Sequence, residues 1–266
     1  MQITILASGS SGNACLVQSP DTTILVDAGV RPGPLKKMLG TLARPPATID
    51  AVLVTHAHSD HSGFAGACAH AFDATLYMTE ATERGIKLDH YVKQRIYGKN
   101  TPFRIGTLDI HPMEVPHDAP QVALVFSHQE ARAALVTDLG AIPPNLGEHI
   151  KDCHTLMIES NYDPSMLKNG PYPPHIQERV RSGYGHLSNE QCASSLEGLS
   201  PKTKRVVLMH LSKKNNLPEL AHQAASQALL RSNVDLLLGD SLPHLLSIPS
   251  ASSTRTIAAK QMQFAW

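Results

Sequence analysis

The stretch Ala51-Val-Leu-Val-Thr-His56-Ala-His58-Ser-Asp60-His61-Ser-Gly63 decides how this chain folds. It opens with an apolar run that predicts a buried strand, and four metal-binding side chains follow within six positions. His56 and His58 are two residues apart, so an extended backbone points both to the same side. Asp60 and His61 come where the chain turns, and they can face a neighbouring position. The stretch therefore predicts a strand-end loop that supplies ligands to two metal ions.

Imidazole and carboxylate together are typical ligands of zinc, manganese and iron. The alternative is a polar loop that is merely rich in histidine, but clusters of this density are rare in such loops. We therefore expect two divalent transition-metal ions, Zn, Mn or Fe, as cofactors. A pair of such ions can hold both the attacking and the leaving oxygen of a hydrolysis.

Three further polar residues follow apolar runs later in the chain. His117 follows the predicted strand 107–115, Asp138 follows 133–137, and His210 follows 204–209. Taken alone, each would more often be an ordinary buried polar residue that is hydrogen-bonded. Combined with the cluster at 56–61 they become ligand candidates, and seven candidates exceed what one tetrahedral ion can use.

The remaining pattern predicts strands and helices without long linkers or internal repeats. Further strands are expected at residues 2–7, 14–18, 23–27, 49–56, 74–78, 121–127, 155–159 and 234–238. Helices are expected at 32–42, 63–71, 79–88, 189–199 and 217–230, the fourth capped by Ser188, with a polar, proline-bearing insertion at 166–183. Two sets of strands, each followed by helices, indicate an α/β protein.

The form His-x-His-x-Asp-His after a hydrophobic strand and a threonine resembles the signature of the metallo-β-lactamase-fold hydrolases. Three further motifs, Ser8-Gly-Ser-Ser-Gly-Asn13, Gly185-His-Leu-Ser-Asn189 and His210-Leu-Ser-Lys-Lys-Asn-Asn216, resemble the YycJ/WalJ group of bacterial hydrolases. This resemblance extends from about Met1 to Asp240. It implies a four-layer αββα sandwich with a metal site at the strand ends, and an exonuclease that acts on nucleic acid.

The resemblance also implies how the ligands are shared. One ion would be bound by His56, His58 and His117, the other by Asp60, His61 and His210, with Asp138 bridging the two. Asp27 would support the histidine loop from behind. Tyr162 stands where the resembled group has histidine, so no role is carried over to it.

Two residues are candidates for catalysis, Asp60 and His186. Asp60 could orient the attacking water or accept its proton, and His186, in a glycine-flanked turn, could reach a scissile phosphate. The alternative for His186 is a histidine at the entry of a helix. The candidate substrate contacts are Ser11, Asn13, Asn189, Lys213 and Lys214. The first two belong to a Gly/Ser loop that could bind a phosphate or form a tight turn.

The composition restricts the kind of protein. With 266 residues, we expect one domain, 1–266, with a flexible tail from about 248. Lysine plus arginine equals aspartate plus glutamate, at 23 each, so any nucleic-acid site must be local. One candidate is the run containing Lys93, Arg95 and Lys99 with interleaved Tyr91, Tyr97 and Phe103, although a solvated helix face would explain it as well. Four scattered cysteines and the absence of a signal peptide or apolar span predict a cytoplasmic protein without a membrane segment.

These observations predict a binuclear metal-dependent phosphodiesterase that hydrolyses nucleic acid. The resemblance narrows it to a DNA 5′-exonuclease. Two alternatives remain open: a hydrolase of a small cyclic phosphate, thioester or lactone, and a non-catalytic metal-containing regulator that binds DNA. The oligomeric state is not predicted.

Overall fold

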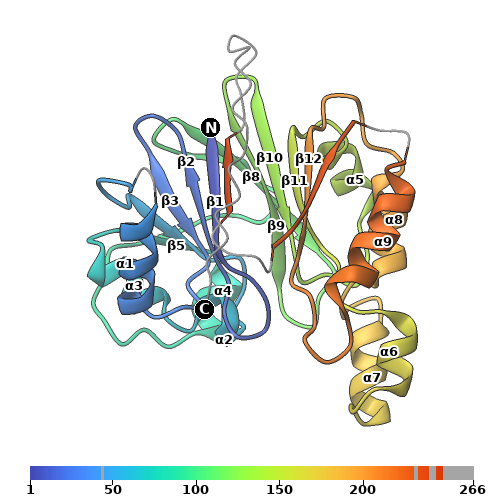
Figure 1. Cartoon of the computed structure of the whole chain (residues 1–266). Coiled ribbons are helices and arrows are strands. Elements are labelled where there is room, and N and C mark those ends of the chain that lie inside the picture. Colours follow the sequence, from blue (N-terminus) through green and yellow to red (C-terminus); the bar gives the residue numbers. More distant parts are fainter. Residues whose placement is uncertain (43–44, 231–232, 240–243, 248–266) are drawn as a thin grey trace.

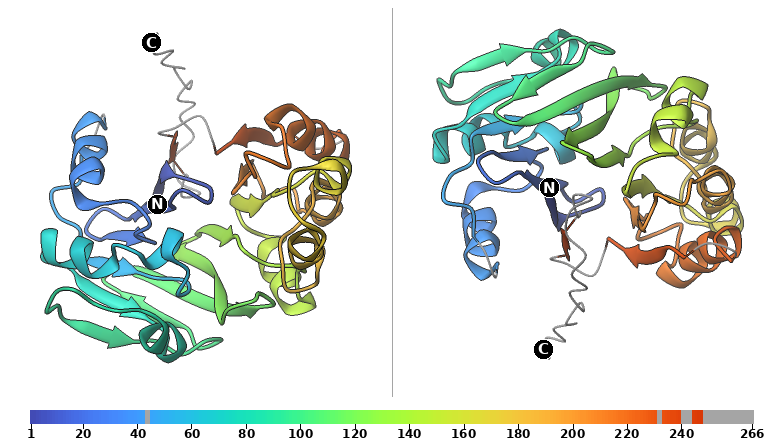
Figure 2. Two further views of the ribbon diagram at one scale, coloured as in Figure 1. Left: turned by 90° about the horizontal axis from the view of Figure 1, so that it is seen from below. Right: turned by 90° about the horizontal axis from the view of Figure 1, so that it is seen from above.

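Most strands of this protein are nearly continuous apolar runs, because both faces of each sheet are covered. The computed structural model describes residues 1–42, 45–230, 233–239 and 244–247. Within them, two seven-stranded sheets face each other and helices lie on the two outer sides (Figure 1). Figure 2 shows the same layers from both ends of the molecule. The predicted four-layer αββα sandwich is confirmed.

The first sheet has the order β14-β1-β2-β3-β4-β5-β6. Its strands β1 to β3 are antiparallel, and β3 to β6 run parallel. These strands are β1 (Gln2–Ala7), β2 (Ala14–Gln18), β3 (Thr23–Val26), β4 (Ala51–Leu53), β5 (Thr75–Met78), β6 (Gln94–Ile96) and β14 (His244–Ser247). Strand β14 pairs with β1 and was not predicted.

The second sheet has the order β13-β12-β11-β10-β9-β8-β7. Its strands β7 to β10 are antiparallel, and β10 to β13 run parallel. These strands are β7 (Phe103–Ile105), β8 (Leu108–Val115), β9 (Gln121–His128), β10 (Ala131–Val136), β11 (Thr155–Glu159), β12 (Arg205–Met209) and β13 (Asp235–Leu238). The parallel part of each sheet brings several carboxyl ends to one edge.

Alternating side chains of the strands fill the layers on either side of each sheet. Val17 and Leu53 of the first sheet share the inner core with Leu124 and Val207 of the second. Their neighbours along each strand point outward, toward the helices. On the first sheet, Leu16, Leu25 and Val52 pack with residues of α1 (Pro32–Thr41) and α3 (Ala65–Ala71). On the second sheet, Ala134, Leu156 and Val206 pack with residues of α5 (Pro144–Ile150), α8 (Asn189–Leu196) and α9 (Pro218–Ala228). Because the inner core joins both sheets, the sandwich is one packed unit.

Two short helices, α6 (Pro164–Asn169) and α7 (Pro174–Arg181), lie where a polar insertion was predicted. Proline stands at the start of each helix, where its missing N–H breaks no hydrogen bond. The buried side chains of Tyr162, Leu167 and Val180 hold the pair together. Residues 163–184, which we name the arm, project from the lower edge of the second sheet (Figure 1).

The run of basic and aromatic residues at 87–104 is not a base-stacking surface. Tyr97 is buried, donates a hydrogen bond to the Val54 carbonyl at 2.7 Å and stacks with Phe103 at 5.0 Å between ring centroids. Both rings therefore pack within the sandwich. Of the three aromatic residues in this run, only Tyr91 is fully exposed. The expectation for Tyr97 and Phe103 was wrong because both flank or belong to short strands that the pattern did not reveal.

The remaining helices are α2 (Ser59–Ser62) and α4 (Glu80–Gly85), the latter capped by the Thr79 hydroxyl. The tail predicted from about 248 lies outside the described residues. Among the described helices, none has the length and apolar character needed to cross a bilayer.

Candidate metal centre

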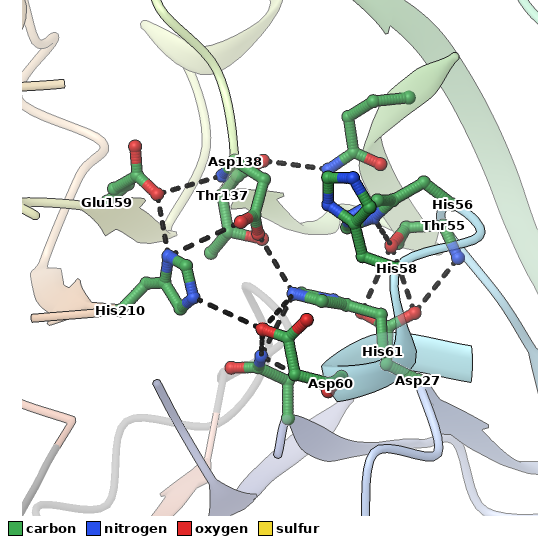
Figure 3. A network of polar contacts seen from close by, with 12 residues as sticks. Asp27, Thr55, His56, His58, Asp60, His61, Thr137, Asp138, Glu159 and His210 are labelled. Carbon is green, nitrogen blue, oxygen red and sulfur yellow. Dashed lines mark hydrogen bonds and ion pairs between the residues drawn. The ribbon is translucent and has the colours of Figure 1, made fainter. Parts of the chain in front are cut away.

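The seven predicted ligands meet at the carboxyl ends of strands from both sheets. Figure 3 shows His56, His58, Asp60, His61, Asp138 and His210 of this set. The loop after β4 and the short helix α2 supply His56, His58, Asp60 and His61. Strands β8, β10 and β12 of the other sheet are each followed by one more ligand, namely His117, Asp138 and His210. The centre is thus formed between the two halves of the chain.

Three residues at these strand ends have a left-handed backbone, which turns the chain sharply away from the strand. The φ angles are 59° for Asp27, 58° for Asp138 and 56° for His210. Non-glycine residues adopt this region rarely and at some cost, although Asp and His are among the more tolerant. Gly29 permits a close approach nearby, since a Cβ there would overlap the Asp60 carbonyl oxygen.

Three of the histidines have one ring nitrogen held by a buried side chain. His61 Nδ1 lies 2.7 Å from Asp27 Oδ2, and His210 Nδ1 lies 2.8 Å from Glu159 Oε2. His56 Nδ1 lies 3.1 Å from the Thr55 hydroxyl, which Asp27 holds in turn. Each contact fixes the ring and leaves Nε2 to face the centre, as is usual for histidines that bind metals.

The other two histidines follow the same rule through different partners. His117 Nδ1 lies 3.2 Å from the Gly185 carbonyl oxygen. His58 Nε2 lies 3.3 Å from Asp118 Oδ1, so this ring presents Nδ1 instead. The five rings therefore leave Nε2 of His56, His61, His117 and His210 and Nδ1 of His58 as possible ligand atoms.

These remaining atoms come close enough to share ions. His58 Nδ1 and His117 Nε2 are 3.3 Å apart. Asp60 Oδ2 lies 3.6 Å from His61 Nε2 and 3.7 Å from His210 Nε2. In each of three groups the ligand atoms lie within 4.8 Å of one another: His56, His58 and His117; Asp60, His61 and His210; and His56, His61 and Asp138. The first two groups contain the same residues as the two sets that the family resemblance implies.

Unsatisfied polar atoms and buried negative charge also fit a metal. His56 Nε2 and His210 Nε2 are buried without a hydrogen-bond partner. The carboxylates of Asp27, Asp138 and Glu159 are buried, and within the described part of the chain their ion-pair partners are histidines. Buried carboxylates need compensating positive charge, which divalent ions would provide.

The pKa shifts have the same electrostatic origin. Burial lowers the pKa of His56 well below its ordinary value, which favours the neutral imidazole. Burial also lowers the pKa of His61, but Asp138 and Asp27 outweigh burial and raise that pKa to about 10. Burial raises the pKa of Glu159, but His186 and His210 outweigh it and lower that pKa to about 2. The carboxylates therefore remain ionised and attract positive charge into the centre.

Glu159 was not predicted, although it organises one side of the centre. One carboxylate oxygen accepts from the backbone N–H of Leu187 at 2.8 Å. The other accepts from the N–H of Asp138 at 3.0 Å and lies within 3.0 Å of the Nδ1 atoms of His186 and His210. The only sequence signal was a carboxylate that ends an apolar run, the same pattern seen at Asp27 and Asp138.

His186 stands at the rim of the centre with its side chain 18% exposed. Its Nδ1 is used toward Glu159, which leaves Nε2 for a substrate. Burial lowers the pKa of His186, but the Glu159 carboxylate outweighs burial and raises that pKa. His186 also falls in a compact group with Asp138, Glu159 and His210, so its position suits either a substrate contact or a metal ligand.

The predicted substrate contacts are only partly accessible. Ser11, Lys213 and Lys214 are exposed. Asn13 is buried, and its amide nitrogen lies 2.9 Å from His61 Nε2 and 3.4 Å from Asp60 Oδ2, so it supports the ligands. Asn189 is also buried, and both polar atoms of its side chain are hydrogen-bonded to Ser160 and Asn216, so its role as a substrate contact stays a prediction.

Tyr162, which replaces the expected histidine, is buried among the apolar residues of the arm. Its carbonyl oxygen accepts from the Asn189 N–H at 2.9 Å. Tyr162 thus has a packing role at the base of the arm.

Comparisons with known proteins show which proteins this chain resembles. A family model described as a β-lactamase superfamily domain matches residues 22–211. The chain is 34% identical over 252 residues to exodeoxyribonuclease WalJ of Streptococcus pneumoniae serotype 2 (strain D39 / NCTC 7466), covering 90% of this chain and 93% of that protein. It is 31% identical over 237 residues to exodeoxyribonuclease YycJ of Bacillus anthracis, covering 86% and 89%.

A solved structure shows the same fold. The metallo-β-lactamase fold protein YhfI from Bacillus subtilis superposes with a TM-score of 0.72 and 16% identity, covering 92% of this chain and 99% of that chain.

Proposed function

Because the chain belongs to the β-lactamase superfamily, and within it to the family of the exodeoxyribonucleases WalJ and YycJ, we propose that it is a metal-dependent exodeoxyribonuclease. The observation that carries the proposal is the arrangement of the five histidines. Each has one ring nitrogen engaged by an outer partner, and the other nitrogens converge with Asp60 and Asp138. A structural histidine cluster would have no reason to leave buried Nε2 atoms unsatisfied.

Two divalent ions would be held here, one by His56, His58 and His117 and the other by Asp60, His61 and His210, with Asp138 between them. Zinc, manganese and iron all suit this set of nitrogen and oxygen donors. Such ions supply Lewis acidity, which activates water and neutralises negative charge on a phosphodiester. We also propose that the fold is one domain, since one inner core joins both sheets.

The surrounding side chains suggest how the substrate is handled. The Asp60 carboxylate is 23% exposed and lies beside the candidate ligand histidines, so it can orient water or accept its proton. His186 presents Nε2 at the rim and can contact a phosphate oxygen or protonate the leaving group. Glu159 fixes the orientation of His186 and His210.

The rim nearest the arm offers local positive charge in a chain without net charge. Arg181 in the last turn of α7 and Lys213 and Lys214 after β12 are exposed, and Tyr184 is 65% exposed close to His186 in the sequence. Cations bind phosphates and an exposed aromatic ring can stack on a base. These residues support DNA as the substrate, and the names of the relatives support exonucleolytic cleavage. Cleavage from the 5′ end is the polarity that we propose from the family resemblance.

A panel of substrates tests the proposal. Protein loaded with manganese or zinc should digest 5′-phosphorylated DNA progressively from one end, and His58→Ala and Asp138→Ala should lose metal and nuclease activity together. RNA, bis-p-nitrophenyl phosphate, a thioester and a lactone should be included. Turnover of a thioester or lactone without cleavage of any nucleic acid would overturn the proposal in favour of a small-substrate hydrolase.

A further inference from the structure

His58 differs from the other ligand histidines in its exposure. Its side chain is 40% exposed, whereas the side chains of His61, His117 and His210 are at most 4% exposed. A buried ring is held by the packing around it, but a ring at the surface can rotate and exchange its tautomer. His58 therefore depends more than the others on the group that binds its second nitrogen.

That group is Asp118, the residue after His117. Asp118 Oδ1 lies 3.3 Å from His58 Nε2 and 3.3 Å from His117 Nε2. An N–H at His58 Nε2 that donates to this carboxylate leaves Nδ1 unprotonated, and Nδ1 is the atom that faces His117 Nε2 at 3.3 Å. Asp118 thus favours the tautomer that can bind an ion.

Asp118 is in turn held by the arm. Arg179 Nε, in the last turn of α7, lies 3.6 Å from Asp118 Oδ2. The end of the arm is fixed nearby, because His117 Nδ1 contacts the Gly185 carbonyl and a Cβ at Gly185 would overlap the carbonyl oxygens of Arg179 and Val180. Arg179, Asp118 and His58 therefore form a continuous series of contacts from the arm to the centre.

We propose that Asp118 is a positioning residue that sets the tautomer and orientation of His58, and that Arg179 links it to the arm. The inference rests on His58 being a metal ligand, as in the proposed function. It assigns the arm a second role besides its cationic surface. Occupancy of the ion at His56, His58 and His117 would depend on residues 118 and 179, which do not bind that ion.

The first test uses metal-free protein and needs no DNA, so its failure is distinct from failure of the nuclease proposal. Two-bond ¹H–¹⁵N spectra of the histidine rings at alkaline pH distinguish Nε2–H from Nδ1–H. We expect His58 as the Nε2–H tautomer in the parent and as a mixture in Asp118→Ala, with Asp118→Asn in between. As a control, Asp109→Ala removes a half-exposed, ion-paired aspartate near the start of β8. This variant should leave the His58 tautomer unchanged. An unchanged His58 in Asp118→Ala would overturn the proposal.

The second test measures zinc affinity by competition with a chromophoric chelator. Asp118→Ala should weaken one of two binding events about tenfold to a hundredfold, as for other residues that support a metal-binding histidine, and should leave the other unchanged. Outright loss of one ion while the His58 tautomer persists would make Asp118 a ligand and would also overturn the proposal.

The third test separates the arm from the carboxylate. Arg179→Ala should shift the His58 tautomer in the same direction as Asp118→Ala, to a smaller extent, because the pair is exposed to solvent. Arg181→Ala, on the same helix and similarly exposed, is the matched control and should leave the spectrum unchanged. Identical spectra for Arg179→Ala and the parent would refute the link to the arm.

Discussion

The carboxylate of Glu159 connects His186, His210 and the backbone of Asp138, so one buried side chain orients residues from three segments. Asp27 has the corresponding place on the other sheet, where it holds His61 and Thr55. Each sheet therefore contributes one buried carboxylate that lies behind the candidate ligands. Replacing a residue in this position typically costs about tenfold to a hundredfold in metal affinity or activity.

Replacing His186 by alanine should separate catalysis from metal binding. We expect the metal content of His186→Ala to equal that of the parent and turnover to fall about a hundredfold, since a positioned proton donor or phosphate contact is lost. Metal is measured by elemental analysis and turnover with labelled DNA. His175→Ala, which removes an exposed histidine from α7, serves as control. Unchanged turnover would show that His186 is only a structural residue at the start of a helix. Loss of an ion would show that His186 is a metal ligand.

A histidine pair far from the centre should affect the stability of the protein in acid. His111 of β8 and His149 of α5 are in contact, with ring centroids 4.7 Å apart. Burial, followed by the charges of His149 and Arg132, lowers the pKa of His111. Between this lowered pKa and the ordinary one the unfolded chain binds more protons, so stability falls as the pH drops through that window.

His111→Gln should therefore lose less stability than the parent as the pH falls below the ordinary histidine pKa of about 6.5. Urea unfolding with a chelator present measures this without interference from metal release, and His175→Gln is the control. Equal losses in His111→Gln and the parent would contradict the assignment.

At this scale the sequence pointed to side chains that the structure brings together, because His-x-His-x-Asp-His places four candidate ligands on one short loop. His117, Asp138 and His210 became credible only in combination with that loop. Glu159 and Asp118 were not found, since each is a single carboxylate whose role depends on contacts with distant residues. The left-handed backbone at Asp27, Asp138 and His210 has no signal in residue type alone.

At the scale of elements, the arm forms two short helices that its sequence pattern did not predict. A polar, proline-bearing insertion was predicted at 166–183, yet two of the four prolines between residues 164 and 174 begin the helices α6 and α7. Most predicted strands and helices agree with the structure within a few residues. The short strands β6 and β7 were missed because three residues are too few to establish an alternating pattern.

The loop between β12 and α9 should contribute to DNA binding. Lys213 and Lys214 are exposed shortly after the candidate ligand His210, and Lys214 Nζ lies 5.4 Å from the Tyr172 ring of the arm. Each phosphate contact releases counterions, so alanine at both positions should reduce the slope of log affinity against log salt by about one to two units.

The slope is measured by fluorescence anisotropy on labelled DNA with a catalytically inactive parent. The matched control removes Lys202 and Lys204, which are exposed at the opposite end of β12. A double variant at 213 and 214 with the parental slope would place the DNA elsewhere.

At the scale of the whole molecule, the two sheets meet through an apolar interior and through the candidate centre. The family resemblance of the sequence predicted the four layers. The strand order and the pairing of β14 with the first sheet could not be predicted from the sequence. Strand pairing between residues so distant in the chain leaves no local pattern.

Removing metal should weaken the contact between the two sheets at the candidate centre. Ions that bind only the folded state stabilise it by mass action, which amounts to about 2.7 kcal/mol when free metal is a hundred times its Kd. Excess chelator should therefore lower the midpoint of thermal unfolding, and added zinc or manganese should restore it. The doubly substituted protein His58→Ala/His210→Ala should not respond to chelator. A parent midpoint that is the same with and without chelator would contradict metal binding at this centre.

The chain passes from the first sheet to the second between β6 and β7, through the exposed residues Gly98, Lys99 and Asn100. A break there would leave His56, His58, Asp60 and His61 on one fragment and His117, Asp138 and His210 on the other. Each proposed ion would then join two separate polypeptides, so the protein should behave as a metal-dependent heterodimer of its own halves. Protein cut at an inserted protease site at Gly98 should remain one species in gel filtration with zinc, and should separate at a lower urea concentration after chelation.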